Sequence, residues 1–343
     1  MKTLVFTGGH HTGALEVAKR LQNDGWHIVW FGHRHSLWGE NADSGEYREV
    51  TAAGVPFIDL KAGKFYRTFH PLKLIRIPYG FFQALLQLLL LRPNGIVSFG
   101  GYLAVPTVIA GWLLGIPAIT HEQTVVAGWA NKLICLFARK IAVTWSQSAS
   151  NYPKSKVIFT GLPLRAEVKK IRNKKLEIRN SIYVTGGKQG AHVINVAVFA
   201  ALPQLLKKYT VIHQTGFADL PHALEIKDPH YQAFDFSSPY AISALAQAEV
   251  IVGRSGAHTT YELAFLGKKS VLIPISTASH NEQYLNAKLL VDSGAAIILP
   301  QSQLTSQSLI AAIASAQKLS PHKLNLTYDA TDKLVQLIKQ QFS

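Results

Sequence analysis

The sequence predicts an α/β fold with two doubly wound domains, each built on a parallel sheet. Short apolar runs alternate with stretches of helical spacing through most of the chain, as expected for parallel strands covered by helices on both faces. A strand followed by paired glycines and a helix recurs near the start of each half. Ligands bind at the carboxyl ends of such strands, so we expect both sheets to face a central cleft.

Strand candidates in the first half are short apolar runs, several of which end in glycine. They lie at residues 3–7, 27–31, 56–60, 96–99, 118–120, 141–145 and 157–160, with helical spacing at 14–21. A polar, charge-dense stretch without an apolar period follows, which is typical of an interdomain region. The predicted first domain therefore covers residues 1–162, and the interdomain region covers residues 163–180.

The alternation of strands and helices starts again after this region. Strands are expected at residues 181–185, 211–213, 250–252, 271–274 and 296–299, and helices at 306–316 and 328–342. The predicted second domain covers residues 181–325. A C-terminal helix within residues 326–343 is expected to pack back toward the first domain.

Composition restricts the class of protein. Of 343 residues, 48% are hydrophobic and 16% are charged, so the chain can bury two cores and is not of the disordered type. Cys135 is the single cysteine, which rules out an intramolecular disulfide. The apolar run at 77–91 is interrupted by Pro78 and Gly80 and is shorter than the roughly 20 residues that span a bilayer. We expect a cytoplasmic protein, soluble or bound to a membrane surface.

The net charge of +15 favours negatively charged partners, such as phosphorylated substrates, anionic lipid or nucleic acid. Nucleic acid is not expected, because the basic residues are dispersed and no binding motif occurs. A basic surface without a specific partner is the simpler alternative.

Three motifs in the first half follow expected strands. They are Gly8-Gly9-His10, Gly100-Gly101-Tyr102 and His121-Glu122-Gln123. Glycines let a backbone approach a ligand, a helix N-terminus offers N–H groups to an anion, and His10 could accept a proton. Tight turns are the alternative for the two glycine motifs. No metal site is expected, because His121 and Glu122 point in opposite directions on an extended chain and no third ligand has suitable spacing.

Three motifs in the second half have a similar context. They are Gly186-Gly187-Lys188-Gln189-Gly190, the segment 254–262 and the segment 280–287. The first would suit a diphosphate, to which Lys188 adds a cation. In the second motif, Glu262 could accept hydrogen bonds from both ribose hydroxyls. The alternative is a carboxylate that is favoured near the helix start by the helix dipole. The third, taken alone, equally fits an exposed helix start.

Taken in order, these segments resemble the MurG family, the bacterial UDP-N-acetylglucosamine transferases of peptidoglycan synthesis. The resemblance covers nearly the whole chain and is best at GGYLAVPTVIAGWLLGIPAITHEQ, GGKQGAHVIN, HQTG, and RSGAHTTYELAFLGKKSVLIP through NEQYLNAKLLVDSGAA. It implies a GT-B fold of two Rossmann-like domains. It also implies inverting transfer of N-acetylglucosamine from UDP-N-acetylglucosamine to undecaprenyl-diphosphate-linked N-acetylmuramoyl-pentapeptide, converting lipid I to lipid II without a cofactor.

The resemblance also assigns site residues by position. The acceptor-side residues are Gly8, Gly9, Gly100, Gly101, Tyr102 and Asn131, beside His121 and Glu122. The donor-side residues are Arg165, Gly187, Lys188, Gln189, Gly190, Ser255, Gly256, Glu262, Gln283 and Asn286. His10 is the preferred general base, with His121 or Glu122 as the alternatives.

A lipid-linked acceptor implies work at the anionic inner face of the plasma membrane. The segment 70–92 combines leucines, isoleucines and paired phenylalanines with Lys73, Arg76 and Arg92. Apolar residues flanked by cations suit docking onto such a surface. A buried helix is the alternative for its leucine-rich half.

The chain departs from the family pattern in three places. Val5 and Phe6 stand where the family usually has glycines, Thr124 where it has asparagine, and Lys188 where it has serine. The first two departures leave the exact acceptor open. The alternatives are a related transferase acting on another polyprenyl-linked sugar, a UDP-sugar epimerase of the same fold, and a non-catalytic UDP-sugar-binding protein.

Overall fold

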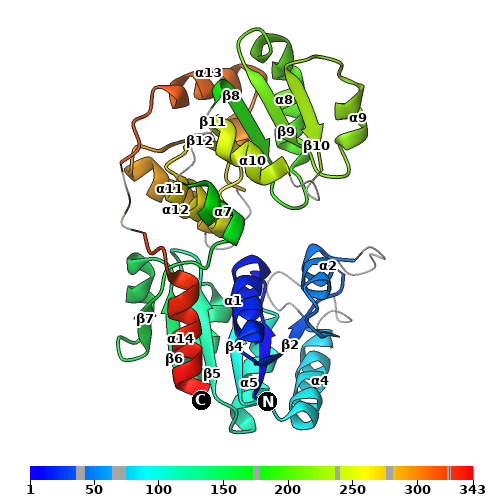
Figure 1. Ribbon diagram of the computed structural model, residues 1–343, viewed down its shortest axis with the longest axis vertical. Helices are drawn as coiled ribbons and strands as arrows, with labels where there is room; N and C mark the ends of the chain where they lie inside the picture. The colour runs from blue at the N-terminus through cyan, green and yellow to red at the C-terminus, as the bar shows by residue number, and fades with distance from the viewer. Residues whose placement is uncertain are drawn as a thin grey trace. The chain divides into compact units, whose positions relative to one another are not determined.

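The chain forms two compact units in the computed structural model (Figure 1). Unit 1 comprises Met1–Arg165 and Thr327–Ser343, and unit 2 comprises Ala166–Leu326. The structure describes residues 1–35, 43–63, 75–172, 178–235, 240–275, 281–322, 324 and 326–342.

Unit 1 is a seven-stranded parallel sheet with helices on both faces. Its elements are β1 (Thr3–Thr7), α1 (His11–Asn23), β2 (His27–Gly32), α2 (Gly45–Ala52), β3 (Phe57–Asp59), α4 (Arg76–Leu91), β4 (Gly95–Ser98), α5 (Ala104–Leu113), β5 (Ala118–Glu122), α6 (Trp129–Phe137), β6 (Lys140–Val143), η1 (Ser146–Asn151), β7 (Val157–Phe159) and α14 (Ala330–Phe342). The strand order is β3-β2-β1-β4-β5-β6-β7. Alternate residues of β1 explain the two layers: Leu4 and Phe6 pack with α1 and α14, whereas Val5 packs with α4 and α5.

Unit 2 repeats this design with six parallel strands. Its elements are α7 (Ala166–Ile171), β8 (Ile178–Thr185), α8 (His192–Leu205), β9 (Thr210–Gln214), α9 (Leu220–Glu225), β10 (Tyr231–Phe234), α10 (Tyr240–Gln247), β11 (Ala248–Gly253), α11 (Ala257–Leu266), β12 (Lys269–Leu272), α12 (Glu282–Asp292), β13 (Ala296–Ile298), η3 (Gln301–Gln303) and α13 (Ser306–Gln317). The strand order is β10-β9-β8-β11-β12-β13. Both units thus confirm the predicted α/β class with doubly wound parallel sheets.

Each sheet has a point at which the strand order reverses. In unit 1, β1 lies between β2 and β4, and in unit 2, β8 lies between β9 and β11. The loops leaving the two strands at such a point run to opposite faces of the sheet and open a crevice at the strands' carboxyl ends. The glycine motifs at Gly8, Gly100 and Gly187 follow β1, β4 and β8, respectively.

The C-terminal helix α14 belongs to unit 1 and packs against α1 (Figure 1). Leu334 and Ile338 are fully buried in the core on that face of the sheet. Lys339 Nζ lies 2.8 Å from a carboxylate oxygen of Asp24 at the end of α1. At Gly95, an added Cβ would fall 2.5 Å from the Phe342 ring, so the start of β4 needs glycine to admit this helix.

Two details differ from the sequence analysis. Strand β5 includes His121 and Glu122, which were expected directly after it, because the ladder continues by pairing them with Ala142 and Val143 of β6. The range predicted as interdomain also contains α7 and the start of β8. Helix α7 buries only Val168, so it has no apolar period to reveal it.

Candidate functional site

The two glycine motifs of unit 1 touch each other through their backbones. Gly9 N–H donates to the Gly100 carbonyl at 3.0 Å, and Phe99 N–H donates to the Thr7 carbonyl at 2.7 Å. Gly8 has φ +137°, and an added Cβ there would lie 2.7 Å from the Phe99 carbonyl carbon. Only glycine fits this contact, so the loops after β1 and β4 form one continuous surface at the switch point.

His10 lies on this surface, whereas His121 lies beneath it. His10 is half-buried at the N-cap of α1, with Nδ1 3.4 Å from the Phe99 carbonyl oxygen. His121 is 1% exposed, and its ring lies tilted beside the Phe99 ring, with 5.6 Å between the centroids. Its Nε2 lies 2.9 Å from the Gly161 carbonyl; a carbonyl only accepts, so this nitrogen carries the proton. Burial lowers the His121 pKa to about 4, so the ring is neutral at physiological pH.

Glu122 is a buried hub of hydrogen bonds, with 2% of its surface exposed. Its Oε1 accepts from the Thr124 backbone N–H at 3.0 Å and lies 2.9 Å from the Thr124 hydroxyl. Its Oε2 accepts from Asn131 Nδ2 at 2.7 Å and from the Tyr152 hydroxyl at 2.5 Å. Asn131 Oδ1 in turn accepts from Gly101 N–H at 2.9 Å. This arrangement favours a positioning role for Glu122 over proton transfer.

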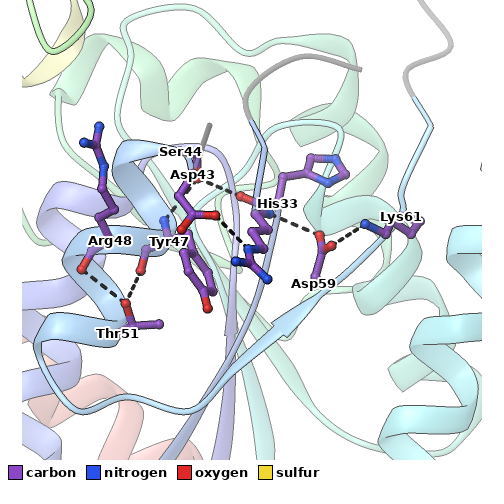
Figure 2. Close-up of polar contacts among 9 residues, drawn as sticks. His33, Asp43, Ser44, Tyr47, Arg48, Thr51, Asp59 and Lys61 are labelled. Carbon is purple, nitrogen blue, oxygen red and sulfur yellow. Dashed lines mark hydrogen bonds and ion pairs between the residues drawn. The ribbon is translucent and has the colours of Figure 1, made fainter. Parts of the chain in front are cut away.

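A second polar cluster lies at the carboxyl ends of β2 and β3 (Figure 2). Arg34 Nε donates to Asp43 at 2.7 Å, and Lys61 pairs with Asp59. The Ser44 hydroxyl caps α2 by accepting from Tyr47 N–H at 3.1 Å. Because each of these cations has a carboxylate partner, the cluster holds α2 and the strand ends together and adds little net charge.

Tyr102 follows the second glycine motif and borders that cluster. Its ring is 38% exposed, and its centroid lies 5.9 Å from that of His33. Burial raises the pKa of the Tyr102 phenol, which therefore stays protonated near neutral pH. Tyr102 thus offers a hydrogen-bond donor at the edge of the loop surface.

In unit 2, the loop after β8 packs against the loop after β9. Gly190 has φ +80°, and an added Cβ would lie 2.2 Å from the Thr215 carbonyl oxygen. Reciprocally, a Cβ at Gly216, with φ +79°, would lie 2.5 Å from the Gln189 carbonyl oxygen. Gly187 also has a left-handed φ of +81°, but nothing lies within 4 Å of its Cβ position. Gly190 therefore needs glycine for contact, and Gly187 only for its backbone conformation.

Gln214 supports the loop after β8, although it was not among the site residues predicted from the sequence. Its Nε2 donates to the Gly187 carbonyl at 3.0 Å, while its Oε1 accepts from the hydroxyls of Thr185 and Tyr183, both at 2.7 Å. Gly187 N–H donates to the Thr185 hydroxyl at 3.1 Å. A polar residue at the carboxyl end of an apolar strand was the available signal.

A cavity of about 380 Å³ opens at this edge of unit 2. It is lined by Gly186, Lys188, Gln189, Gly190, Ala191, Arg254 and Ile275. Arg254 was not among the predicted site residues, although it directly follows β11. Its guanidinium donates to the Ile273 carbonyl at 2.9 Å, and burial lowers its pKa. Two cations and no carboxylate among the lining residues favour an anionic ligand.

The remaining donor-side residues cluster around the start of α11. Gly256 is its N-cap and has no side chain to cap the helix, so the first N–H groups suit an anion. Ser255 is fully buried, and its carbonyl accepts from Asn286 Nδ2 at 3.3 Å. Glu262, in the second turn, is 6% exposed. Gln283 Oε1 accepts from Ile275 N–H at 3.0 Å, which ties α12 to the cavity rim.

Two predicted features fall outside these groups. Arg165 is the last residue of the first segment of unit 1, and its role at the donor stays a prediction. His280, the first residue of the sixth motif, lies outside the described residues.

Both halves of the chain match glycosyltransferase models. Residues 5–143 match the N-terminal domain of glycosyltransferase family 28, and residues 181–341 match its C-terminal domain. A UDP-N-acetylglucosamine--N-acetylmuramyl-(pentapeptide) pyrophosphoryl-undecaprenol N-acetylglucosamine transferase 2 of Bacillus cereus is 36% identical over 326 residues, 90% of each chain. The crystal structure of Acinetobacter baumannii MurG superposes with a TM-score of 0.74, at 25% identity over 99% of this chain and 100% of that one. The chain belongs to the MurG family.

MurG relatives also match at full length. A transferase of the same name, without the final number, from Legionella pneumophila is 29% identical over 360 residues, 99% of this chain and 97% of the relative. A UDP-GlcNAc 2-epimerase from Neisseria meningitidis, bound to UDP-GlcNAc, superposes with a TM-score of 0.68 at 13% identity. That likeness shows a shared fold alone, so the MurG relatives carry the functional argument.

Proposed function

We propose that the chain transfers N-acetylglucosamine from UDP-N-acetylglucosamine to undecaprenyl-diphosphate-linked N-acetylmuramoyl-pentapeptide, with inversion at the anomeric carbon. The observation that carries this proposal is the 36% identity, over 90% of both chains, with a relative named for this reaction. Glycine loops at the switch point of each sheet support it, because such loops suit one diphosphate-bearing substrate per unit.

In this proposal, unit 2 binds the donor. The uridine diphosphate occupies the cavity lined by Lys188 and Arg254, with its phosphates near the start of α11, where the N-cap is Gly256. Glu262 holds the ribose, and Gln283 contacts the sugar. As UDP leaves, negative charge grows on its diphosphate, and fixed cations and helix N–H groups stabilise that charge. Lys188, where the family usually has serine, adds one cation to this set.

Unit 1 binds the acceptor in this proposal. The acceptor diphosphate lies against the joined loops of Gly9 and Gly100, and an acceptor hydroxyl attacks the anomeric carbon of the donor. Its proton passes to His10. His10 is preferred over His121 and Glu122 because it is half-buried, whereas they are 1% and 2% exposed.

A transfer assay with the full chain tests the function. We expect UDP and a product heavier by one N-acetylglucosamine when UDP-N-acetylglucosamine meets the muramoyl-pentapeptide lipid. A panel of other polyprenyl-diphosphate sugars serves as the comparison. Conversion of the donor without acceptor would indicate an epimerase. Donor binding without turnover would indicate a non-catalytic protein, and transfer only to another lipid would redefine the acceptor.

Unit 1 also carries a candidate membrane surface, the exposed apolar face of α4, α5 and α6. These helices pack side by side, and their exposed large side chains are Tyr79, Phe82, Leu86, Leu89, Leu90, Trp112, Leu113, Trp129, Leu133 and Leu136. Arg76, Arg92 and Lys132 lie on the same helices or directly after them, whereas Lys73 lies outside the described residues. Among the described helices, none is long and apolar enough to cross a bilayer. We propose that this face docks on anionic lipid.

Replacing Phe82 and Leu86 together with serine should weaken binding to phosphatidylglycerol vesicles by about a hundredfold or more, because each buried apolar side chain contributes about 1.5–3 kcal/mol. Flotation at low and high salt measures this, and wild-type binding should decrease with salt. Leu224→Ser is the matched control, since Leu224 is 51% exposed on α9 of unit 2 and Leu86 is 55% exposed. Equal binding by all variants would contradict the docking surface.

A further inference from the structure

A continuous series of hydrogen bonds connects Tyr152, remote from every sequence motif, to the second glycine loop. The Tyr152 hydroxyl donates to Glu122 Oε2 at 2.5 Å, and Asn131 Nδ2 donates to the same oxygen at 2.7 Å. Gly101 N–H donates to Asn131 Oδ1 at 2.9 Å. The members come from four separate segments: the residue after η1, strand β5, helix α6 and the loop after β4.

The carboxylate of Glu122 determines which way the Asn131 amide points. An ionised carboxylate only accepts hydrogen bonds, so Asn131 must turn its NH₂ toward Glu122. Its carbonyl oxygen then faces Gly101 N–H. The reverse orientation would set oxygen against oxygen at Glu122 and NH₂ against N–H at Gly101, which would leave both of these part-buried contacts unsatisfied.

Asn131 holds the loop in a conformation that needs such support. Gly100 and Gly101 both have left-handed φ angles, +71° and +79°. An added Cβ at Gly100 would lie 2.4 Å from Asn131 Oδ1, so the amide packs directly on the loop. The direction of the Gly101 peptide therefore depends on where Glu122 places Asn131.

Tyr152 fixes Glu122 in turn. Its ring is 6% exposed and packs with Ile141 and Val143, so the hydroxyl cannot turn to bulk water. Burial and the neighbouring Glu122 raise the Tyr152 pKa, so the phenol keeps its proton and remains a donor. Removing that hydroxyl would take one of the two donors from Oε2 and leave Asn131 alone to hold it.

We propose that Tyr152 is a positioning residue for acceptor binding, which sets the Gly100–Gly101 loop through Glu122 and Asn131. It does not touch the substrate. The kinetic consequence rests on the proposed function, whereas the effect on the loop does not.

Tyr152→Phe tests this proposal, with Tyr209→Phe as the matched control. Tyr209 lies directly before β9, at the amino edge of the unit 2 sheet. It is also 6% exposed, and its hydroxyl donates to Gln317 at 2.7 Å. Both variants lose one phenol hydrogen bond of a buried tyrosine and should lose thermal stability, Tyr152→Phe somewhat more because its partner is a carboxylate. Only Tyr152→Phe should lower the acceptor kcat/KM, by about five- to tenfold, with UDP affinity unchanged.

Amide hydrogen exchange of the folded chain, followed in a peptide that covers residues 99–104, supplies a measurement that needs no substrate. We expect faster exchange at Gly101 in Tyr152→Phe and Glu122→Gln, and no change in Tyr209→Phe. The variant that carries both Glu122→Gln and Tyr152→Phe should lose less acceptor kcat/KM than the two single variants would predict if their effects were independent. Both residues act through one series of hydrogen bonds, so their effects are not additive.

Two results would overturn the positioning role. One is unchanged exchange at Gly101 in Tyr152→Phe. The other is a loss of acceptor kcat/KM that Tyr209→Phe reproduces. If the wild-type chain transfers no sugar at all, the proposed function fails, while the exchange measurement still decides whether Tyr152 positions the loop.

Discussion

Replacing His10 with alanine is expected to lower kcat by about 10²- to 10⁴-fold, the usual contribution of a general base. His10 is the N-cap of α1 and directly follows Gly9 in the joined glycine loops of unit 1. Its Nδ1 lies 3.4 Å from the Phe99 carbonyl oxygen. The described residues that line the proposed UDP cavity belong to unit 2. UDP affinity, measured by calorimetry, should therefore stay close to that of the wild type.

His27→Ala is the matched control for His10→Ala. His27 is also half-buried in unit 1, but it begins β2 at the opposite edge of the sheet. It should leave kcat unchanged. Near-normal turnover in the His10→Ala variant would remove His10 from the role of base. His121 would then be the next histidine to test, although burial lowers its pKa to about 4.

Gly190→Ala should strongly weaken donor binding. The new Cβ would need a left-handed φ, which costs about 1–2 kcal/mol for a non-glycine residue. It would also lie 2.2 Å from the Thr215 carbonyl oxygen, so the loop would have to move away from Gly216. Because Lys188 and Gln189 lie on this loop and line the cavity, UDP affinity should decrease by about tenfold or more.

Gly187→Ala separates the two causes. Its φ of +81° imposes the same backbone strain, but its Cβ would meet nothing within 4 Å. We expect a moderate loss of thermal stability in Gly187→Ala and larger losses of stability and of UDP affinity in Gly190→Ala. Equal effects in the two variants would show that strain alone matters and that packing against the next loop does not shape the donor site.

Sequence patterns predicted much of the architecture because parallel sheets buried on both faces need continuous apolar strands. The runs at 3–7 and 181–185 became the central strands β1 and β8. Their glycine motifs mark the strand ends, so the location of both loops was also predictable. The short helix α7 and the half-exposed edge strand β10 were not, since neither buries enough side chains to leave a period.

The predicted acceptor-side residues divide by depth in a way that no spacing reveals. His10 and Tyr102 reach the loop surface, whereas His121 and Glu122 are enclosed beneath it. The sequence favoured His10 as the base and kept His121 and Glu122 as alternatives, but it gave no measure of their depth. Burial and saturated hydrogen bonding distinguish Glu122 as a support for Asn131.

The order of apolar runs and glycines in this sequence, by itself, determined the fold class and the positions of the loops, and the longer motifs that resemble MurG indicated the family. These features are local, since a strand's period and a glycine's freedom depend on neighbouring residues only. Tertiary structure alone decided three contacts. Tyr152 donates to Glu122, Gln214 donates to the Gly187 carbonyl, and Arg254 and Lys188 line one cavity. Each of these contacts joins residues at least 27 positions apart, and only the packing of the sheet brings such residues within bonding distance.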